Sequence, residues 1–278
     1  MQLSRAEVDD FINRSLAEDI GRGDLTTMVT IPAGTRLRAS MVARQEVVVC
    51  GIEIAALTFR RVHQEIKVEV KVRDGDKVAK GAVLAVVEGD ARPVLAAERT
   101  ALNILQHLSG IATEVRKYAD AVEGTGCTLI DTRKTIPTLR NVAKYASYIG
   151  GARNHRIRLD DGVLIKDNHI AAAGSLTETV KRAKRATPAL TVIEVECDSL
   201  EQVKEAAESG VDMILLDNMG VDDLKKAVAI VNRRCRIECS GGVTLETVRD
   251  KAMTGVDFIS SGRMTQSASA VDIGLDWG

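Results

Sequence analysis

Three cationic residues follow directly after short apolar runs of the sequence. Arg133 and Lys134 close the run CTLIDTRK (127–134), and Lys166 follows GVLI in the run 162–169. A charge at the end of a buried strand is costly to desolvate unless it meets an opposite charge. Arginine offers a planar fork that suits carboxylates, and lysine offers a point charge that suits phosphates. This mixture predicts a site for a small substrate with several negative groups.

Two acidic residues end later apolar runs in the same way. Glu196 ends TVIEVE and Asp217 ends MILLD. Salt bridges to neighbouring cations would account for both carboxylates. If they face a bound polyphosphate, they would instead hold Mg²⁺, which commonly uses one or two carboxylates together with substrate oxygens. They could equally grip ribose hydroxyls, and the sequence leaves these alternatives open.

Small residues follow the last two apolar runs, at 240–242 (SGG) and 260–262 (SSG). Glycine lets backbone N–H groups approach an oxyanion, and barrel enzymes commonly bind phosphate with the loops after their final strands. Plain turns between strand and helix are the alternative. Two such turns in this position indicate a phosphate site.

The positive charge is local to one segment. Between Asp131 and His169, eight Lys and Arg residues accompany four Asp, whereas the 278-residue chain has a net charge of −1. Arg140, Lys144 and Arg158 in this segment are interpreted as ordinary surface cations. The charge balance excludes a protein-wide field for nucleic acid, and with only 3% aromatic residues an RNA-binding surface lacks stacking groups.

The remaining composition indicates a globular protein of one large domain or two ordinary ones. No window approaches the ~20 apolar residues of a membrane span. The N-terminal 20 residues alternate charged and apolar types at helical spacing, which predicts a cytoplasmic protein rather than a secreted one. Five widely spaced cysteines without a C-x-x-C pair are expected to be free, mostly buried thiols rather than zinc ligands.

Two groups of elements must position these residues. Up to about residue 95, Val- and Ile-rich runs at 41–50, 66–72 and 82–89 are typical of antiparallel strands. From Leu95 to Val122, apolar residues recur at helical spacing and predict one long helix. Six short apolar runs then alternate with helical stretches, which indicates a parallel sheet buried on both faces. Because each run ends in polar groups, the pattern favours a closed α/β barrel with its chemistry at the carboxyl ends of the strands.

Specific motifs accompany this pattern. DTRKTIPTLR (131–140) is followed by KY (144–145), GG (150–151), NHR (154–156) and LIKDNH (164–169). Together with EDIGRGDLTT (18–27), ERTALN (98–103), LSGIAT (108–113), EVE (194–196), LDNM (216–219) and DIGLD (272–276), they closely resemble the quinolinate phosphoribosyltransferase family over nearly the whole chain.

The resemblance implies an α/β protein with two domains, working as a homodimer or a dimer-based oligomer. Residues 1–103 and 266–278 would form an α/β sandwich, and residues 104–265 an open, incomplete α/β barrel of the type II phosphoribosyltransferase kind. The implied reaction transfers phosphoribose from 5-phosphoribosyl-1-pyrophosphate to quinolinate with decarboxylation. Its products would be nicotinate mononucleotide, CO₂ and pyrophosphate, in de novo NAD biosynthesis.

The resemblance also implies roles for individual residues. Lys134 and Lys166 would lie between quinolinate and the phosphoribosyl donor, and Glu196 and Asp217 would hold the ribose hydroxyls and Mg²⁺. Arg99 would reach the site from the neighbouring subunit. The further substrate-binding residues would be Thr132, Arg133, His155 and Arg156 around quinolinate, and Ser240, Gly241, Gly242, Gly262, Arg263 and Met264 around phosphate.

The chain departs from the family's usual pattern at a few positions in and near these motifs, namely Ile136, Thr138, Ala152, Arg158, Asp160 and Gln266. None of the ionic residues at the strand ends is replaced. A rival from another class is a non-catalytic anion-binding or transport-accessory protein on the same scaffold. Such a protein would not need the acidic pair Glu196 and Asp217, which favours the enzyme.

Overall fold

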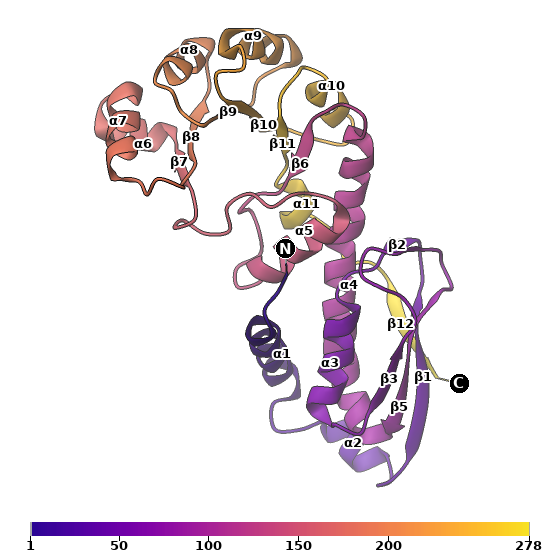
Figure 1. Cartoon of the computed structure of the whole chain (residues 1–278). Coiled ribbons are helices and arrows are strands. Elements are labelled where there is room, and N and C mark those ends of the chain that lie inside the picture. Colours follow the sequence, from indigo (N-terminus) through magenta and orange to yellow (C-terminus); the bar gives the residue numbers. More distant parts are fainter. Residues whose placement is uncertain (1, 278) are drawn as a thin grey trace. The chain divides into compact units, whose positions relative to one another are not determined.

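A computed structural model describes residues 2–277 as two compact units (Figure 1). The first unit combines residues 2–116 with residues 141–150 and 268–277, and the second contains residues 117–140 and 151–267. These limits differ from the predicted domains, because residues 104–116 and 141–150 pack with the first unit. The first unit is therefore assembled from three separate segments of the chain.

A four-stranded antiparallel sheet of order β12-β1-β5-β3 forms the centre of the described first unit. Its apolar residues pack against two helices, with Met41 and Leu84 from the sheet and Phe59 and Leu105 from the helices in one core. The antiparallel arrangement predicted from the runs 41–50, 66–72 and 82–89 is confirmed. The sheet strands are β1 (Arg36–Ala43), β3 (Lys67–Val70), β5 (Val83–Asp90) and β12 (Ile273–Trp277), and β2 (Val47–Val48) pairs with β4 (Lys77–Val78).

Helices of the first unit begin where the sequence provides caps. Ser4 and Glu7 form a capping box at the start of α1, each satisfying a backbone N–H that the helix leaves free. The long helix predicted from Leu95 begins slightly earlier, and only its last turns belong to the second unit. The helices are α1 (Arg5–Ile20), α2 (Leu25–Thr30), α3 (Ile52–Val62), α4 (Ala91–Val122) and α5 (Arg140–Gly150).

The position of Lys144 in α5 differs from the sequence-based prediction. It was expected on the surface, but its side chain is fully buried. The reason lies in the helical period, which places Lys144 beside Val142, Ala143 and Ala146 on the buried side of α5. Arg140 at the start of this helix is half-buried rather than exposed.

A parallel sheet of order β6-β11-β10-β9-β8-β7 forms the described second unit. It is strongly buried, as in β9, where four successive residues are buried, and this agrees with the unbroken apolar runs of the sequence. The strands are β6 (Thr128–Ile130), β7 (Val163–Ile165), β8 (Ile193–Cys197), β9 (Met213–Asp217), β10 (Arg236–Ser240) and β11 (Phe258–Ser260).

This sheet is curved but open. Figure 1 shows its strands along an arc, with α7, α8, α9 and α10 on the outer side. Among residues 2–277, β6 and β7 share no ladder, so the two ends of the sheet do not join. The expectation of a closed barrel is thus wrong, and the open, incomplete barrel implied by the family resemblance is correct. The helices are α6 (Asp167–Ala173), α7 (Leu176–Ala186), α8 (Leu200–Glu208), α9 (Val221–Val231), α10 (Val248–Ala252) and α11 (Arg263–Gln266).

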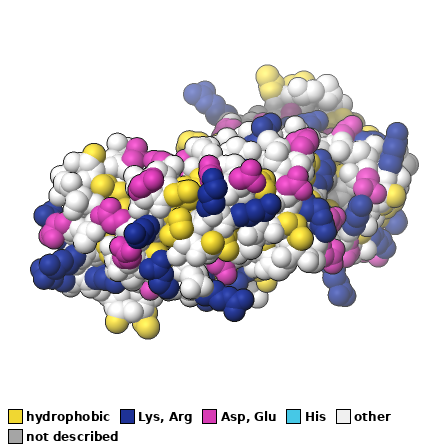
Figure 2. Space-filling model, turned by 90° about the horizontal axis from the view of Figure 1, so that it is seen from above, with side chains coloured by type: hydrophobic (Ala, Val, Ile, Leu, Met, Phe, Trp, Pro, Cys, Tyr) yellow, Lys and Arg dark blue, Asp and Glu magenta, His cyan; other side chains and the backbone are white. Residues whose placement is uncertain are grey.

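The surface agrees with the balanced composition. On the face shown in Figure 2, Lys and Arg side chains are interspersed with Asp and Glu, and neither sign dominates a broad area. Within the described chain, every helix is too short or too polar to cross a lipid bilayer.

Candidate active site

The register of the parallel sheet places the strand-end acids on one face. Glu196 of β8 pairs with Leu215 of β9, and Asp217 of β9 pairs with Ser240 of β10. Paired residues of neighbouring strands point to the same side, and side chains two apart on one strand do so too. Glu196, Asp217 and Ser240 therefore share a face, with Asp217 one side-chain layer closer to the carboxyl end than Glu196.

Lys166 joins this group from the neighbouring strand. It follows β7 directly, and its Nζ forms an ion pair with Glu196 Oε2. The Lys166 side chain remains 43% exposed, whereas that of Glu196 is 13% exposed. The ammonium group is therefore accessible to a ligand, and Glu196 holds it at the rim of the sheet.

The loop after β6 carries the next cations. The Thr132 hydroxyl accepts a hydrogen bond from the Lys134 N–H at 3.0 Å, and the Thr265 hydroxyl donates to the Lys134 carbonyl at 2.7 Å. A Cβ atom at Gly262 would lie 2.6 Å from Lys134 Cδ, so the absence of a side chain there makes room for the lysine. Lys134 thus lies against the glycine loop that follows β11.

The loop after β10 has the open backbone expected of a phosphate site. Gly241 has a φ of +76° and lies so close to Asn218 that a Cβ atom would be 2.3 Å from its side-chain oxygen. Asn218 in turn donates to the Asp217 carboxylate at 2.6 Å. The glycine therefore lets the β10 loop pass next to the Asp217 end of β9.

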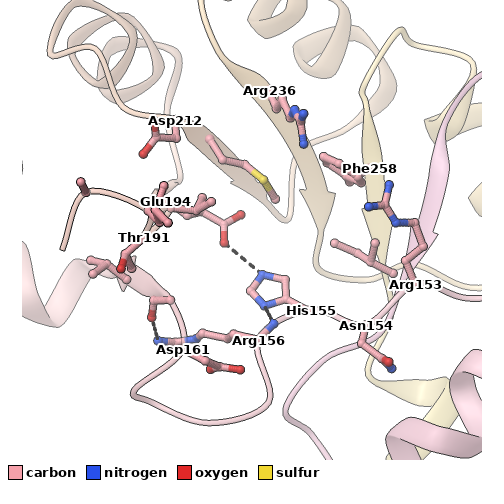
Figure 3. A pocket seen from close by; sticks show the side chains of 17 residues that line it. Arg153, Asn154, His155, Arg156, Asp161, Thr191, Glu194, Asp212, Arg236 and Phe258 are labelled. Atoms are coloured by element: carbon pink, nitrogen blue, oxygen red, sulfur yellow. Dashed lines mark hydrogen bonds and ion pairs between the residues drawn. The ribbon is translucent and has the colours of Figure 1, made fainter. Parts of the chain in front are cut away.

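A cavity of about 580 Å³ lies within the second unit (Figure 3). His155, Arg156 and Glu194 are among the residues that line it. Asp131 anchors this segment, because its carboxylate accepts from the His155 N–H at 2.8 Å and from the Asn154 amide at 2.7 Å. The strand end of β6 thereby fixes the position of the NHR motif.

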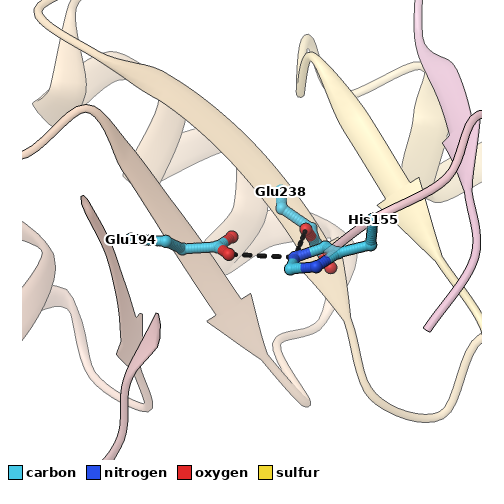
Figure 4. Close-up of side chains that lie close together, drawn as sticks. All are labelled: His155, Glu194 and Glu238. Carbon is cyan, nitrogen blue, oxygen red and sulfur yellow. Dashed lines mark hydrogen bonds and ion pairs between the residues drawn. The ribbon is translucent and has the colours of Figure 1, made fainter. Parts of the chain in front are cut away.

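His155 lies between two buried carboxylates (Figure 4). Its Nε2 is 3.0 Å from Glu194 Oε2 and 3.4 Å from Glu238 Oε2, and the two glutamates are 3% and 1% exposed. Burial lowers the pKa of His155, but hydrogen bonds and charges of the two glutamates raise it to about 10. Burial raises the pKa of Glu194 to about 7 despite the opposing effect of His155.

The other ring nitrogen of His155 shows where the proton lies. The Arg156 N–H donates to Nδ1 at 2.7 Å, so in this arrangement Nδ1 carries no proton and Nε2 does. The two carboxylates favour a second ring proton, and this hydrogen bond opposes it. The hydrogen bond decides which tautomer is present, because two N–H groups would not face each other at that distance.

Arg156 and Arg133 supply unused donors. Arg156 Nη1 donates to the Gly162 carbonyl at 2.8 Å, while among the described residues Nε of Arg156 and Nε of Arg133 are buried without hydrogen-bond partners. Burial and the nearby positive charge of Arg133 lower the pKa of Arg156. Two neighbouring guanidinium groups with free donors are suited to bind a ligand with carboxylates.

Positions where the chain departs from the family pattern lie beside these arginines. Thr138 has a φ of +69°, a conformation that favours glycine. Arg158 lines a shallow cavity of about 390 Å³ together with Arg133 and Arg140. Arg140 also holds the loop after β6 through the Arg133 carbonyl, at 3.3 Å.

The second unit brings together all but one of the predicted site residues. Arg99 is the exception, since it lies on the part of α4 that belongs to the first unit. The Met264 side chain is fully buried, so only its backbone could meet a phosphate. Sequence reasoning gave no role to Glu194 or Glu238, although Glu194 belongs to the EVE motif (194–196). The signal that both share is that a glutamate interrupts the apolar runs at 191–197 and 236–242, on the side opposite Val195 and Ile237.

The acidic pair is chemically suited to Mg²⁺. Hard divalent cations of this size bind carboxylate oxygens and keep several waters. Glu196 and Asp217 supply such oxygens from adjacent strands on one face, and the Asp217 carboxylate is partly exposed. A separate group of three side chains, His155, Glu194 and Glu238, also places three atoms that could bind a metal ion within 4.8 Å of one another.

Comparisons with known proteins agree over the whole chain. The family profile described as "Quinolinate phosphoribosyl transferase, N-terminal domain" matches residues 24–109, and the profile for the C-terminal domain matches residues 111–276. The nicotinate-nucleotide pyrophosphorylase (carboxylating) of Mycobacterium leprae is 43% identical, covering 99% of each chain. A probable nicotinate-nucleotide pyrophosphorylase (carboxylating) of Synechocystis is 42% identical, covering 96% of this chain and 92% of the relative. The crystal structure of nicotinate-nucleotide pyrophosphorylase from Ehrlichia chaffeensis superimposes with a TM-score of 0.95 at 42% identity, covering 100% of both chains.

Proposed function

This chain belongs to the quinolinate phosphoribosyltransferase family, and we propose that the residues at the carboxyl ends of its barrel strands perform the family's reaction. The protein is a pentosyltransferase that transfers phosphoribose from 5-phosphoribosyl-1-pyrophosphate to quinolinate, with decarboxylation to nicotinate mononucleotide. This reaction belongs to pyridine nucleotide biosynthesis. The observation that supports the proposed site most directly is the shared face of Lys166, Glu196 and Asp217.

Quinolinate binds through its two carboxylates. Within residues 2–277, the buried Nε donors of Arg133 and Arg156 have no hydrogen-bond partner, and these donors can pair with a planar carboxylate. His155 lies directly before Arg156 and lines the same cavity, so it adds a third polar group for the ligand. The substrate's two carboxylates match this group of cations, whereas a monocarboxylate would leave one cation without a partner.

The phosphoribosyl donor binds along the rim. Its phosphates meet the backbone of 240–242 and 262–264, where glycines leave N–H groups accessible. Thr132 positions Lys134 through the hydroxyl contact to its N–H. Glu196 and Asp217 hold the ribose hydroxyls and Mg²⁺, which when bound supplies charge stabilisation to the pyrophosphate.

The chemical step begins with the bond between ribose C1 and pyrophosphate. As that bond breaks, the ribose gains oxocarbenium character and the leaving group gains negative charge. Lys134 and Lys166 stabilise this charge, and electrostatic stabilisation of this kind is usually the largest contribution to catalysis. The arginines hold quinolinate so that its ring nitrogen forms the new bond to C1, which makes a protein nucleophile unnecessary.

Decarboxylation follows from the new charge on the ring. The ribosylated nitrogen is cationic and stabilises the electron pair that stays on C2 when the 2-carboxylate leaves as CO₂. Carbon C2 then takes up one proton in place of the lost carboxylate. The residues that bound this carboxylate lose their partner at this step, which favours departure of the product.

The working unit is a homodimer in which Arg99 of one subunit completes the site of the other. A symmetric dimer makes two such shared sites. The need for another cation beside a dicarboxylate and a polyphosphate supports this arrangement. The cytoplasm is the proposed location, supported by the bacterial relatives, whose names carry no organelle, unlike the chloroplastic relative of Arabidopsis thaliana.

One assay tests the proposed function. Purified protein is given quinolinate labelled in the 2-carboxylate, and released CO₂ is measured with and without the phosphoribosyl donor and Mg²⁺. Release is expected only when both are present, with one nicotinate mononucleotide formed per CO₂. Release without the donor, or none with all components, would contradict the proposal.

A further inference from the structure

The two glutamates that flank His155 do more than fill the barrel interior. Glu194 lies on β8 and Glu238 on β10, two strands that are separated by β9 in the sheet order. Both carboxylates point toward the same ring nitrogen of His155, Nε2 (Figure 4). Ser260 donates to Glu238 Oε1 at 2.5 Å and so directs the other oxygen, Oε2, toward His155.

The chemistry of a carboxylate determines what the imidazole can do here. An ionised carboxylate only accepts hydrogen bonds, so a ring nitrogen that faces one must carry a proton. Nε2 of His155 is in this position. With the proton at Nε2, Nδ1 is left as an acceptor in the neutral ring, and it receives the Arg156 N–H at 2.7 Å.

Hydrogen bonds through His155 therefore connect the buried glutamates to Arg156, which is proposed to bind quinolinate. The His155 N–H is fixed by Asp131 and the Arg156 N–H by the imidazole, so the backbone on both sides of the residue is fixed. From there the Arg156 guanidinium extends to the Gly162 carbonyl, to which its Nη1 donates. Its Nε has no hydrogen-bond partner among the described residues and can donate to a ligand. Any rotation of the imidazole would release the Arg156 N–H.

We propose that Glu194 and Glu238 are positioning residues that hold His155 in one tautomer and orientation and thereby aim Arg156 at a carboxylate of quinolinate. This inference rests on the proposed function, since quinolinate is the ligand concerned. It assigns to the pair no direct contact with substrate. Buried carboxylates this close to an anion site would repel the anion, and the imidazole that both carboxylates face offsets that effect.

Charge-neutral variants of equal size test the proposal. A glutamine side chain can accept or donate a hydrogen bond. Glu194→Gln and Glu238→Gln therefore allow Nε2 of His155 to be either protonated or unprotonated, and they leave no cavity. The control is Glu208→Gln, the same change at an exposed position on α8. Each variant is characterised by quinolinate affinity from calorimetry, by KM for both substrates, by kcat, and by thermal unfolding.

Loss of a carboxylate that orients a metal-bound histidine typically costs about 10- to 100-fold in affinity or activity, and the orienting role proposed for Glu194 and Glu238 is of the same kind without a metal. We expect the quinolinate Kd and KM to rise about 10-fold in each single variant and more in the double variant. The KM for the phosphoribosyl donor should stay within about twofold, and Glu208→Gln should match the wild type. An unchanged quinolinate affinity would overturn the proposal, as would equal rises in both KM values together with a lowered melting temperature.

A second readout does not depend on activity. The chain has four histidines, so ring nitrogen NMR signals can be assigned with a His155→Asn variant. In the wild type, Nε2 of His155 should carry the proton and Nδ1 should not, and the double glutamine variant should show a mixture of tautomers. The same tautomer mixture in the wild type would contradict the proposal. If the wild-type protein does not convert quinolinate, the proposed function is wrong. The NMR measurement still shows whether the two glutamates fix the tautomer of His155.

Metal analysis distinguishes the remaining alternative. The same three side chains could bind a transition metal, since histidine and carboxylate ligands suit Zn²⁺. One equivalent of Zn²⁺ that copurifies with the wild type and is lost in Glu238→Gln would overturn the positioning role. Wild-type protein without bound zinc that retains full quinolinate affinity supports it.

Discussion

The Lys166 ammonium and the Glu196 carboxylate form an ion pair across the neighbouring strands β7 and β8. Neither residue belongs to the sheet core, and both stand where the strands end. The pair therefore keeps a cation and an acid, both assigned to the phosphoribosyl donor, in fixed proximity before any substrate binds.

Replacement of either rim lysine should strongly reduce catalysis. In Lys134→Ala and Lys166→Ala, kcat/KM is expected to fall by roughly 100-fold or more, because a positioned charge no longer stabilises departing pyrophosphate. Steady-state kinetics at saturating quinolinate measure this. Lys204→Ala, at an exposed position on α8, is the control. Near-normal turnover in Lys166→Ala would reject its role.

Specificity for a dicarboxylate should depend on the two arginines. Nicotinate is expected to be a poor substrate, because it leaves Arg133 or Arg156 without a partner in a partly buried site. In Arg156→Ala, the preference for quinolinate over nicotinate should shrink, measured as the ratio of kcat/KM values. Arg185→Ala, an exposed change on α7, should leave the ratio intact. Comparable values for both substrates in the wild type would contradict the assignment.

The acid at the end of β9 should act on the donor rather than on quinolinate. Asp217→Asn is expected to bind quinolinate normally but to lose donor affinity or to need more Mg²⁺, because a carboxylate oxygen has been removed. Calorimetry with each substrate and a Mg²⁺ titration of activity separate the two effects. Chelation with EDTA should abolish wild-type activity, and Asp222→Asn serves as the exposed control on α9. Weakened quinolinate binding with an intact donor response would reverse the assignment.

Mixing of subunits tests whether Arg99 acts in the partner's site. Arg99→Ala and Lys134→Ala homodimers should each be nearly inactive. In a mixed dimer, the barrel of the Arg99→Ala subunit keeps its own Lys134 and receives an intact Arg99. Random exchange should restore about one quarter of wild-type activity, since half the dimers are mixed and each has one intact site. Confirmed mixed dimers without activity would exclude a shared site.

The cysteines should be unreactive in the folded protein. Burial raises the pKa of Cys127 and of Cys197 to about 12 and that of Cys239 to about 11. The reactive thiolate is therefore scarce at pH 8 and increases only as the pH approaches those values. Alkylation by iodoacetamide, followed by mass spectrometry, should leave these three unmodified at pH 8 and modify all five in denaturant. Rapid labelling of native Cys239 at pH 8 would contradict this.

The charged residues at the strand ends could be predicted from the sequence, because each of them ends a run of apolar residues. Lys166, Glu196 and Asp217 each end a run, and the structure places all three at the rim of one sheet. The prediction of parallel strands also followed from local composition. Closure of the barrel could not be read in this way, because it depends on whether β6 and β7 meet, and nothing in either strand records its distant neighbour.

Residues within the strands were harder to predict. Glu194 and Glu238 differ from their apolar neighbours only by alternation, and their common target His155 lies in a loop 39 residues before Glu194. Burial of Lys144 was missed for a related reason, since a single lysine on a helix reads as exposed unless the packing around it is known. Both failures concern polar groups whose partners come from elsewhere in the fold.

The strand β12 forms an edge of the first unit's sheet by pairing with β1, whose residues precede it by more than two hundred positions. During synthesis, the ribosome therefore finishes every strand of the barrel before it reaches the segment that completes the first unit. Until then β1 presents an open edge with unpaired backbone groups, the kind of surface that recruits chaperones or aggregates. The unit that begins the chain is the last to be completed.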